Sequence, residues 1–279
     1  MSELREFPAP AKLNLMLRVT GRRADGYHLL QTVIRFIDYG DTLSFHVRED
    51  GVVHRVNDIA GVPAADDLSV RAARRLQQAC GTRLGADLTL RKRLPVGGGL
   101  GGGSSDAATT LLALNELWRA GLPRERLLAL ALELGADVPV FVGGESALVE
   151  GIGERLTPLD LPADWYLVLV PPVAVPTARI FSHNQLKRDS KPIKITAFSV
   201  ELAGNDLEPV VCSEYPEVAR HLAWLRQSGP AWVTGAGACV FAAFPTEQAA
   251  RRVWNQAPAG MQGFIARGIA QHPLRDLAR

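Results

Sequence analysis

Six glycines fall within the seven residues from Gly97 to Gly103, and this run constrains the fold more than any other feature of the chain. Each glycine costs backbone entropy on folding, so packing alone does not explain the run. It follows a predicted strand over Leu88–Arg93 and opens directly into a pattern of helical periodicity beginning at Ser104. The N–H groups of such a loop and the positive end of the following helix together bind anions. We therefore expect a polyphosphate site here.

Two other interpretations of the loop stay open at this point. A flexible, solvent-facing segment has a similar composition, although such linkers do not normally open into a capped amphipathic helix. The pattern Gly97-x-Gly99-x-x-Gly102 also matches the dinucleotide-binding fingerprint. That site needs a second strand and an acidic residue about 20 positions on, whereas here one helix leads into another and residue 122 is Leu.

The loop also lacks the lysine of the Walker phosphate loop, because Gly103 directly precedes Ser104. Backbone N–H groups, hydroxyl groups and a metal ion must therefore neutralise the phosphate charge. Ser104 and Ser105 are candidates for contacts with phosphate or Mg²⁺, and either could instead be the helix N-cap.

The first predicted strand places two polar side chains on one face. Residues 11–19 alternate, with apolar side chains at the odd positions, which is typical of a strand buried on one side. Lys12 and Asn14 then lie side by side on the other face, pointing away from that core. An exposed strand lysine is the simpler interpretation of Lys12 when it is considered alone.

The other elements of the first half follow from turn and capping residues. We predict strands near Leu29–Phe36 and Thr42–Val47, a helix from Asp66 or Asp67 to Cys80, a helix from Ser104 ended by Gly121, and a helix from Pro123 to Gly135. Asp137 then leaves the third helix and enters a predicted apolar strand, Val140–Val142. A solvated turn residue is the simpler interpretation of Asp137 alone.

The second half predicts a separate domain. We predict a linker at Arg155–Asp164, strands at Trp165–Val170 and on both sides of Gly235–Gly237, helices near Pro216–Gln227 and Thr246–Gln256, and a last strand at Gly263–Ile269. This order is that of a ferredoxin-like domain. The polar segment Ser182–Lys194 is predicted to be an exposed loop. Because 279 residues exceed what one core usually supports, we expect an α+β protein with domains at 1–155 and 156–279.

Charge and cysteine content narrow the function classes. Lys and Arg number 31 against 29 Asp and Glu, so charge gives no case for a nucleic-acid or membrane partner. Cys80, Cys212 and Cys239 form no C-x-x-C pair, which argues against a disulfide framework or a zinc site. The N-terminal residues lack the apolar core of a secretory signal, and Trp165–Pro176 is too short and proline-broken to span a bilayer. We expect a cytoplasmic protein.

The glycine-rich segment resembles that of a known family. Pro95 to Ala107 follow P-x-x-x-G-L-G-x-x-S-S-x-A, which is similar to the ATP loop of the GHMP kinases: galactokinase, homoserine kinase, mevalonate kinase and phosphomevalonate kinase. Segments beginning at Pro10, Gly21 and Gly135, and a fourth that ends at residue 241, are similar to one branch of that superfamily and occur in its order. The resemblance implies an S5-like N-terminal ATP-binding domain, a ferredoxin-like C-terminal domain and an active site in the cleft between them.

The resemblance also assigns roles to residues. It implies that Asp137 is the catalytic base and Lys12 its partner. A carboxylate near an alcohol helps to remove its proton as the oxygen attacks, and a nearby ammonium favours the ionised carboxylate and stabilises charge on the transferring phosphoryl group. The implied ATP-binding residues are Pro95, Val96, Gly97, Gly98, Gly99, Leu100, Gly101, Gly102, Gly103, Ser104 and Ser105.

The substrate residues that the resemblance implies suit a cytosine ring and its diphosphate. Tyr27 and Phe181 match two aromatic residues that enclose the ring, and His28 matches a histidine at its polar edge; a core position with an incidental histidine explains the same spacing. The remaining implied substrate residues are Asn14, Thr177, Gly235 and Gly237, and an ordinary glycine hairpin turn is the alternative for the last two.

The resemblance implies phosphoryl transfer from ATP to the 2-hydroxyl of 4-diphosphocytidyl-2-C-methyl-D-erythritol, in the non-mevalonate isoprenoid route. ATP and Mg²⁺ are the expected cofactors, and no protein residue is assigned to the metal. Another small alcohol, such as homoserine or mevalonate, is the alternative acceptor, and a nucleotide-binding regulator without catalysis is a third interpretation. We expect a small-molecule substrate, no nucleic-acid or membrane partner, and a monomer or weak homodimer.

Overall fold

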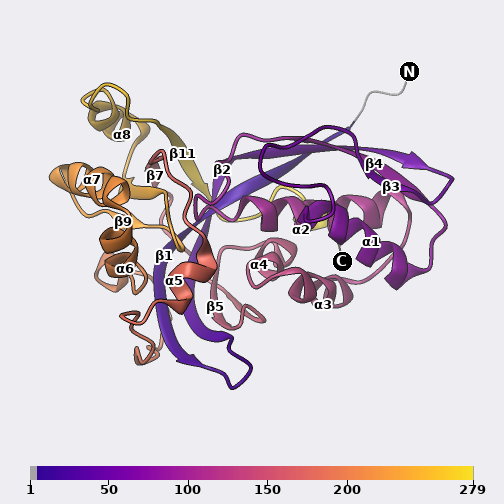
Figure 1. The fold of residues 1–279 in the computed structure, drawn as a ribbon, viewed down its shortest axis with the longest axis horizontal. Helices are drawn as coiled ribbons and strands as arrows, with labels where there is room; N and C mark the ends of the chain where they lie inside the picture. The colour runs from indigo at the N-terminus through magenta and orange to yellow at the C-terminus, as the bar shows by residue number, and fades with distance from the viewer. Residues whose placement is uncertain (1–4, 279) are drawn as a thin grey trace.

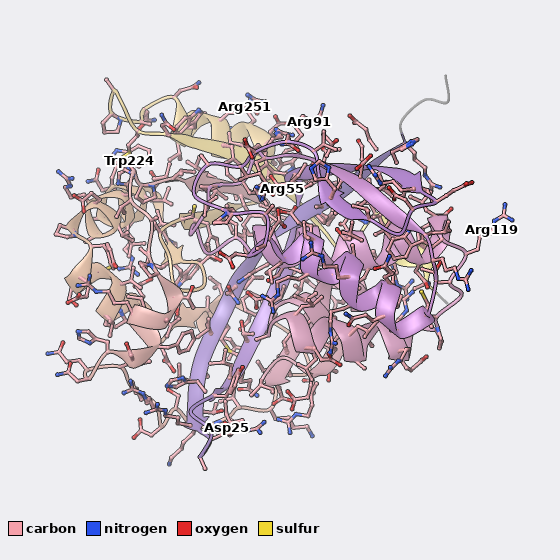
Figure 2. All side chains as sticks on the ribbon, turned by 45° about the vertical axis from the view of Figure 1, so that its right-hand side comes forward. Asp25, Arg55, Arg91, Arg119, Trp224 and Arg251 are labelled. Carbon is pink, nitrogen blue, oxygen red and sulfur yellow. The ribbon has the colours of Figure 1, made fainter. Side chains whose placement is uncertain are left out.

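The computed structural model describes residues 5–278; the predicted absence of a secretory signal rests in part on residues 1–4, which lie outside the described residues. Two long strands, β1 (Glu6–Arg22) and β2 (His28–Arg48), form a hairpin that runs through the middle of the molecule. Figure 1 shows helices α1 to α4 on one side of this hairpin and α6 to α8 on the other. In Figure 2, Asp25 marks the tip of the hairpin.

The other elements have the following bounds. The further strands are β3 (Val53–Arg55), β4 (Gly85–Arg91), β5 (Ala147–Gly151), β6 (Arg155–Pro158), β7 (Trp165–Leu169), β8 (Gly204–Asn205), β9 (Trp232–Val233), β10 (Val240–Phe244) and β11 (Gly263–Ile269). The helices are α1 (Leu68–Cys80), α2 (Gly102–Leu117), α3 (Arg124–Leu134), α4 (Val138–Gly143), α5 (Thr177–Ser182), α6 (Glu208–Glu214), α7 (Pro216–Leu225) and α8 (Glu247–Trp254), with 3₁₀ turns at Val200–Leu202, Arg226–Ser228 and Arg275–Leu277.

One continuous sheet connects the two halves of the chain. Its main order is β3-β4-β2-β11-β7-β10-β9, and β1 and β5 also pair with β2. Antiparallel pairing of β11 with β2 links the halves and sets Gly268 opposite Ile37 and Ile269 opposite Phe36. A short parallel pairing of β8 with β1 links them a second time. Within the second half, β11-β7-β10-β9 is antiparallel throughout, which is the predicted ferredoxin-like arrangement.

The helices of the first half surround α2. All residues of α2 from Ser105 to Asn115 are buried, as expected for a helix covered on every side. Helices α1, α3 and α4 and strands β1 and β2 pack against it. The last turn of the chain returns to this core, where Leu274 and Ala278 are buried among first-half residues. Within residues 5–278, the helices are too short or too polar to cross a bilayer.

The prediction of one buried face for β1 is wrong. Lys12 and Asn14 are 3% and 2% exposed, so both faces of the strand are covered. The register with β2 shifts at three places, one of them between Asn14 and Met16. Each such bulge inserts an unpaired residue and interrupts the alternation of faces, so Leu15 and Met16 are both buried.

Two other predicted strands differ from the structure. The segment Val140–Val142 belongs to helix α4, which begins just after Asp137 with Pro139 in its first turn. Proline is favoured there, and short apolar runs do not distinguish a buried helix from a strand. The strands expected at Leu29–Phe36 and Thr42–Val47 are parts of the single strand β2, which continues through Gly40.

Two segments predicted as irregular are more ordered. The first residues of the expected linker Arg155–Asp164 form β6, which pairs with β5. The segment Ser182–Lys194 is not simply exposed, because Leu186 is 4% and Ser190 is 3% exposed. The backbone N–H of Ser190 donates to the carbonyl of Val19 at 3.0 Å, so this polar loop is held against the hairpin.

Candidate functional site

A cleft of about 490 Å³ lies where the glycine-rich loop, the hairpin and the second half of the chain meet. Of the residues expected to bind ATP or substrate or to act in catalysis, its lining contains Lys12, Asn14, Pro95, Val96, Gly97, Gly98, Gly99, Leu100, Gly101, Gly102, Gly103, Ser104, Asp137, Thr177, Phe181 and Gly235. Tyr27, His28, Ser105 and Gly237 are outside this lining. Most of the residues expected to bind ATP, to bind substrate or to act in catalysis therefore line one cleft.

The conformation of the glycine-rich loop admits only glycine at several positions. Gly97, Gly99 and Gly101 have φ of 71°, 75° and 71°, which L-residues rarely adopt. A Cβ on Gly99 would lie 2.1 Å from the carbonyl oxygen of Thr234, and one on Gly101 would lie 2.9 Å from Cγ of Lys12. The loop thus fits against both strand β1 and the second half of the chain.

Backbone hydrogen bonds anchor the loop on the turn between β9 and β10. The carbonyl of Gly97 accepts from the N–H of Ala238 at 3.1 Å, and the carbonyl of Gly98 accepts from Cys239 at 3.1 Å. The Thr234 hydroxyl donates to the carbonyl of Gly99 at 3.2 Å. The Gly235–Gly237 turn therefore supports the glycine-rich loop, in addition to any contact that it makes with a substrate.

Gly99→Ala is expected to lower ATP affinity by at least tenfold and to destabilise the fold by roughly 1–3 kcal/mol, because the new methyl group would combine φ strain with a clash. Titration calorimetry with ATP and thermal unfolding would measure the two effects. Gly121→Ala is the matched control: it has φ of 65°, but its Cβ would meet nothing within 4 Å. Equal ATP affinity in the two variants would contradict the close approach.

The helix that follows the loop starts earlier than predicted. Helix α2 begins at Gly102 with Gly101 as its N-cap, so neither serine is the cap. Ser104 lines the cleft. Ser105 is fully buried, and its hydroxyl donates to the carbonyl of Pro10 at 2.7 Å. In this arrangement the Ser105 hydroxyl joins α2 to β1 and is not free to contact phosphate.

Lys12 and Asp137 meet in the cleft. Nζ of Lys12 is 3.3 Å from Oδ2 of Asp137, and their side chains are 3% and 41% exposed. The same Nζ donates to Oδ1 of Asn14 at 2.6 Å. Asp137 is held at the start of α4 by the sharp chain reversal after α3, so its carboxylate faces both the buried ammonium and the open cleft. A buried cation and an accessible carboxylate are thus adjacent.

Two threonines that sequence reasoning missed orient Asn14. Its Nδ2 donates to Oγ1 of Thr32 at 2.9 Å, and that hydroxyl donates to the carbonyl of Met16. Its backbone N–H donates to Oγ1 of Thr234 at 3.1 Å. Thr234 directly precedes the Gly235–Gly237 turn, which was the only local signal for it. Asn14 therefore links Lys12, the strand pair and the second half of the chain.

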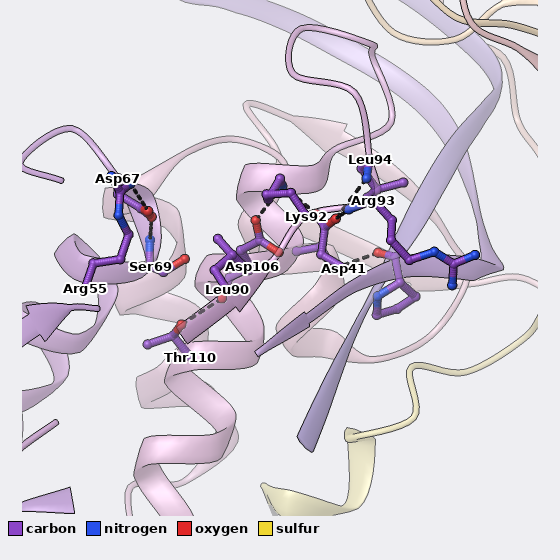
Figure 3. A network of polar contacts seen from close by, with 12 residues as sticks. Asp41, Arg55, Asp67, Ser69, Leu90, Lys92, Arg93, Leu94, Asp106 and Thr110 are labelled. Atoms are coloured by element: carbon purple, nitrogen blue, oxygen red, sulfur yellow. Dashed lines mark hydrogen bonds and ion pairs between the residues drawn. The ribbon is translucent and has the colours of Figure 1, made fainter. Parts of the chain in front are cut away.

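A second lysine, Lys92, is half-buried next to the start of α2 (Figure 3). Nζ of Lys92 donates to Oδ2 of Asp41 at 2.5 Å and to Oδ2 of Asp106 at 2.8 Å. Oδ1 of Asp41 accepts from the backbone N–H groups of Arg93 and Leu94 at 2.6 and 2.9 Å. The network connects the residues that precede the loop with the helix that follows it, and so fixes both ends of the loop.

Protonation in this network is set by burial and charge together. Burial raises the pKa of Asp106 to about 8, against the opposing effect of Lys92, and the Asp41 carboxylate raises it further. Burial disfavours the charge of Lys92, but its two carboxylate partners outweigh that effect and raise its pKa. Oδ1 of Asp106 has no hydrogen-bond partner within residues 5–278. Asp106 lines the cleft, so its protonation state decides whether a negative charge lies near any anion bound there.

Asp67 is the N-cap of α1, which confirms one of the two predicted candidates, Asp66 and Asp67. Its Oδ1 accepts from the N–H of Ser69 at 2.8 Å, and its Oδ2 accepts from Arg55 at 2.7 Å (Figure 3). Arg55 and Asp67 form a buried ion pair at the edge of the cleft. Both carboxylate oxygens of Asp67 are therefore used within the protein.

The three residues expected around a pyrimidine are only partly brought together. The rings of His28 and Phe181 have centroids 4.9 Å apart and are tilted by 39°. Tyr27, at the hairpin turn, is 62% exposed. Phe181 and Thr177, both on α5, line the cleft. Enclosure of a base between Tyr27 and Phe181 stays a prediction.

Comparison with known proteins identifies the family. The model of the GHMP kinases N terminal domain matches residues 67–145, and that of the GHMP kinases C terminal matches residues 194–263. The chain is 60% identical over 274 residues to 4-diphosphocytidyl-2-C-methyl-D-erythritol kinase of Nitrosospira multiformis, with 97% of this chain and 93% of that protein covered. The chain belongs to the 4-diphosphocytidyl-2-C-methyl-D-erythritol kinase family.

Other matches agree with this assignment. The 4-diphosphocytidyl-2-C-methyl-D-erythritol kinase of Aromatoleum aromaticum is 57% identical over 275 residues, with 99% and 97% of the two chains covered. A crystal structure of 4-(cytidine 5'-diphospho)-2C-methyl-D-erythritol kinase matches with a TM-score of 0.80 at 34% identity, covering 95% of this chain and 99% of the other.

The kinases of the alternative acceptors are more distant. A homoserine kinase of Cytophaga hutchinsonii matches with a TM-score of 0.70 at 17% identity, covering 96% and 95% of the chains. A mevalonate kinase of Methanococcus jannaschii gives 0.66 at 12%, covering 96% and 99%. These likenesses show a shared fold alone.

Proposed function

We propose that the chain transfers the γ-phosphoryl group of ATP to the 2-hydroxyl of 4-diphosphocytidyl-2-C-methyl-D-erythritol. The observation that carries the proposal is the 3.3 Å pair of Lys12 and Asp137 in the same cleft as the glycine-rich loop, in a chain that belongs to this kinase family. We further propose that residues 1–155 bind the nucleotide and supply the catalytic pair, and that residues 156–279 contribute substrate contacts.

In the proposed reaction, Asp137 accepts the proton of the acceptor hydroxyl as the oxygen attacks the phosphoryl group. Lys12 is buried beside it, and its ammonium offsets negative charge that develops on the transferring group. Asn14 holds the lysine in place through its 2.6 Å hydrogen bond. The start of α2 and the backbone N–H groups of the loop bind the phosphate chain of ATP and orient it toward this pair.

The cleft offers few ligands for a metal ion. Within residues 5–278, no group of three His, Cys, Asp or Glu side chains is placed to bind one. Asp106 and Asp137 line the cleft, but each is already paired with a lysine. We propose that nucleotide oxygens and water supply most ligands of Mg²⁺, as kinase sites allow, with the Ser104 hydroxyl as the protein ligand. The ion would supply charge neutralisation of the phosphate oxygens.

A coupled assay of ADP release with three acceptors tests the proposed function. The cytidine-diphosphate-linked methylerythritol should support turnover, while homoserine and mevalonate should not exceed the rate without acceptor. Stereochemical and mass analysis of the product should locate the new phosphate on the 2-hydroxyl. Equal turnover with homoserine or mevalonate would refute the acceptor assignment, and tight ATP binding without transfer to any acceptor would favour the regulator. Cytoplasmic location and a monomer or weak homodimer stay predictions.

A further inference from the structure

The residue that faces His28 from the second half of the chain is Arg188. His28 is the first residue of β2, and Arg188 lies in the polar loop that follows α5. Nε–H of Arg188 donates to Nε2 of His28 at 3.1 Å. The imidazole also packs on the ring of Phe181, which lines the cleft. The histidine is thus held between a cation and an aromatic ring at the edge of the site.

The guanidinium of Arg188 has a fixed orientation. Its Nη1 donates to the carbonyl of Leu186 at 3.0 Å, and its Nη2 donates to the carbonyls of Phe181 and His183 at 2.9 and 2.7 Å. Because the guanidinium is planar and rigid, these three contacts fix the direction of its Nε–H. The fold of the loop therefore fixes the direction in which the Nε–H group of Arg188 points toward His28.

The contact determines which imidazole nitrogen carries hydrogen. An arginine N–H can only donate, so Nε2 of His28 must offer a lone pair. A neutral imidazole has one donor nitrogen and one acceptor nitrogen, which places the hydrogen on Nδ1. Within residues 5–278, Nδ1 of His28 has no hydrogen-bond partner, so this N–H is available to a ligand.

The surroundings of His28 also oppose its protonation. Burial lowers the pKa of His28, and the positive charges of Arg188 and Arg22 lower it further. Arg188 comes from the loop after α5 and Arg22 from the end of β1, so cations reach the ring from both halves of the chain. A lowered pKa keeps the neutral form dominant at and above neutral pH, and the cation forms only at lower pH.

We infer that Arg188 is a positioning residue that fixes His28 as a neutral imidazole with its hydrogen on Nδ1, and that this single donor selects cytosine over uracil. This inference rests on the proposed function and adds a residue to it. Cytosine presents unprotonated N3 and O2 as acceptors on its polar edge, whereas uracil carries a hydrogen on N3. The Nδ1–H group of His28, held in one direction, can donate to an acceptor on the edge of cytosine. With uracil, the same N–H would face the N3–H group, so two donors would oppose each other.

The tautomer can be measured without turnover. Long-range ¹H–¹⁵N correlation spectra of the full chain distinguish protonated from unprotonated ring nitrogens, and His28→Gln assigns the signals among the six histidines. The wild-type protein should show Nδ1 protonated and Nε2 unprotonated at neutral pH. A dominant Nε2–H form, or a charged ring at neutral pH, would overturn the inference. This result stands or falls separately from the acceptor assay, which alone decides the proposed function.

Substitution tests the consequence for specificity. Arg188→Met should raise KM for the cytidine-linked substrate about fivefold to tenfold, as expected for loss of one oriented hydrogen bond, and leave KM for ATP unchanged. The preference over a uridine-linked analogue should narrow, and the pKa of His28 should rise. Arg188→Lys keeps the charge but not the rigid fork, so His28 should stay neutral and lose its single tautomer.

Arg179→Met is the matched control. Arg179 lies on α5 close to the same loop, but its side chain is 62% exposed and pairs with Glu214. It should leave the tautomer, the pyrimidine preference and both KM values unchanged. If Arg188→Met instead lowered kcat and both substrate affinities equally, with the pyrimidine preference intact, Arg188 would be only a structural clamp of the loop. If that variant does not fold, the wild-type tautomer still decides the inference.

Discussion

Asp137→Asn is expected to lower kcat by about 10²- to 10⁴-fold while ATP affinity stays nearly unchanged. The amide keeps the size of the side chain but cannot accept the proton of the acceptor hydroxyl. The substitution removes the carboxylate partner of the buried Lys12 ammonium, but Asp137 itself is 41% exposed, and the fold should persist. Lys12 retains its hydrogen bond to Asn14.

Single-turnover kinetics with saturating ATP would separate the chemical step from binding in Asp137→Asn, and calorimetry would give its ATP affinity. Asp160→Asn is a suitable control, because it makes the same change at an exposed position in the loop after β6. Unchanged turnover in the Asp137 variant would remove the assignment of this carboxylate as the base. A matching loss of ATP affinity would make it a binding residue.

Lys12→Met is expected to lower kcat by about 10²- to 10³-fold even at saturating substrate, because a preorganised positive group that acts on developing charge is lost. Methionine fills similar space in a site where Lys12 is 3% exposed, so cavity formation is small. Two acceptor groups, Oδ1 of Asn14 and the carboxylate of Asp137, would lose their ammonium partner.

Steady-state kinetics with both substrates varied would measure the effect of Lys12→Met, with circular dichroism to verify folding. Lys187→Met, on an exposed residue of the loop after α5, controls for loss of charge alone. An effect confined to KM, with kcat preserved, would show that Lys12 serves binding and not the chemical step.

Local signals in the sequence predicted the elements that depend on neighbouring residues. Asp67 caps α1 and Gly81 ends it in the left-handed conformation, as the capping pattern indicated. The last strand, Gly263–Ile269, has the predicted bounds. The two faces of β1 were not predictable in this way, because its bulges depend on pairing with β2 and its second face is covered by a helix about 90 residues later in the chain.

The site residues also fall into those that the sequence predicted and those that depend on contacts distant in the chain. The glycine-rich loop followed from the residues and the Lys12–Asp137 pair from the resemblance, and the structure gathers them in one cleft. Asp41 and Lys92 were missed because they lie 51 residues apart and carry no motif. Arg188 was missed because composition identified its segment only as a polar loop, and because its contact with His28 joins residues 160 positions apart.

The β1–β2 hairpin has a mechanical consequence. It carries Lys12 in its middle and His28 at its far end, and β2 also pairs with β11 of the other half. Because both residues lie on one pair of hydrogen-bonded strands, the length of the hairpin sets the distance between the proposed points of phosphoryl transfer and base recognition.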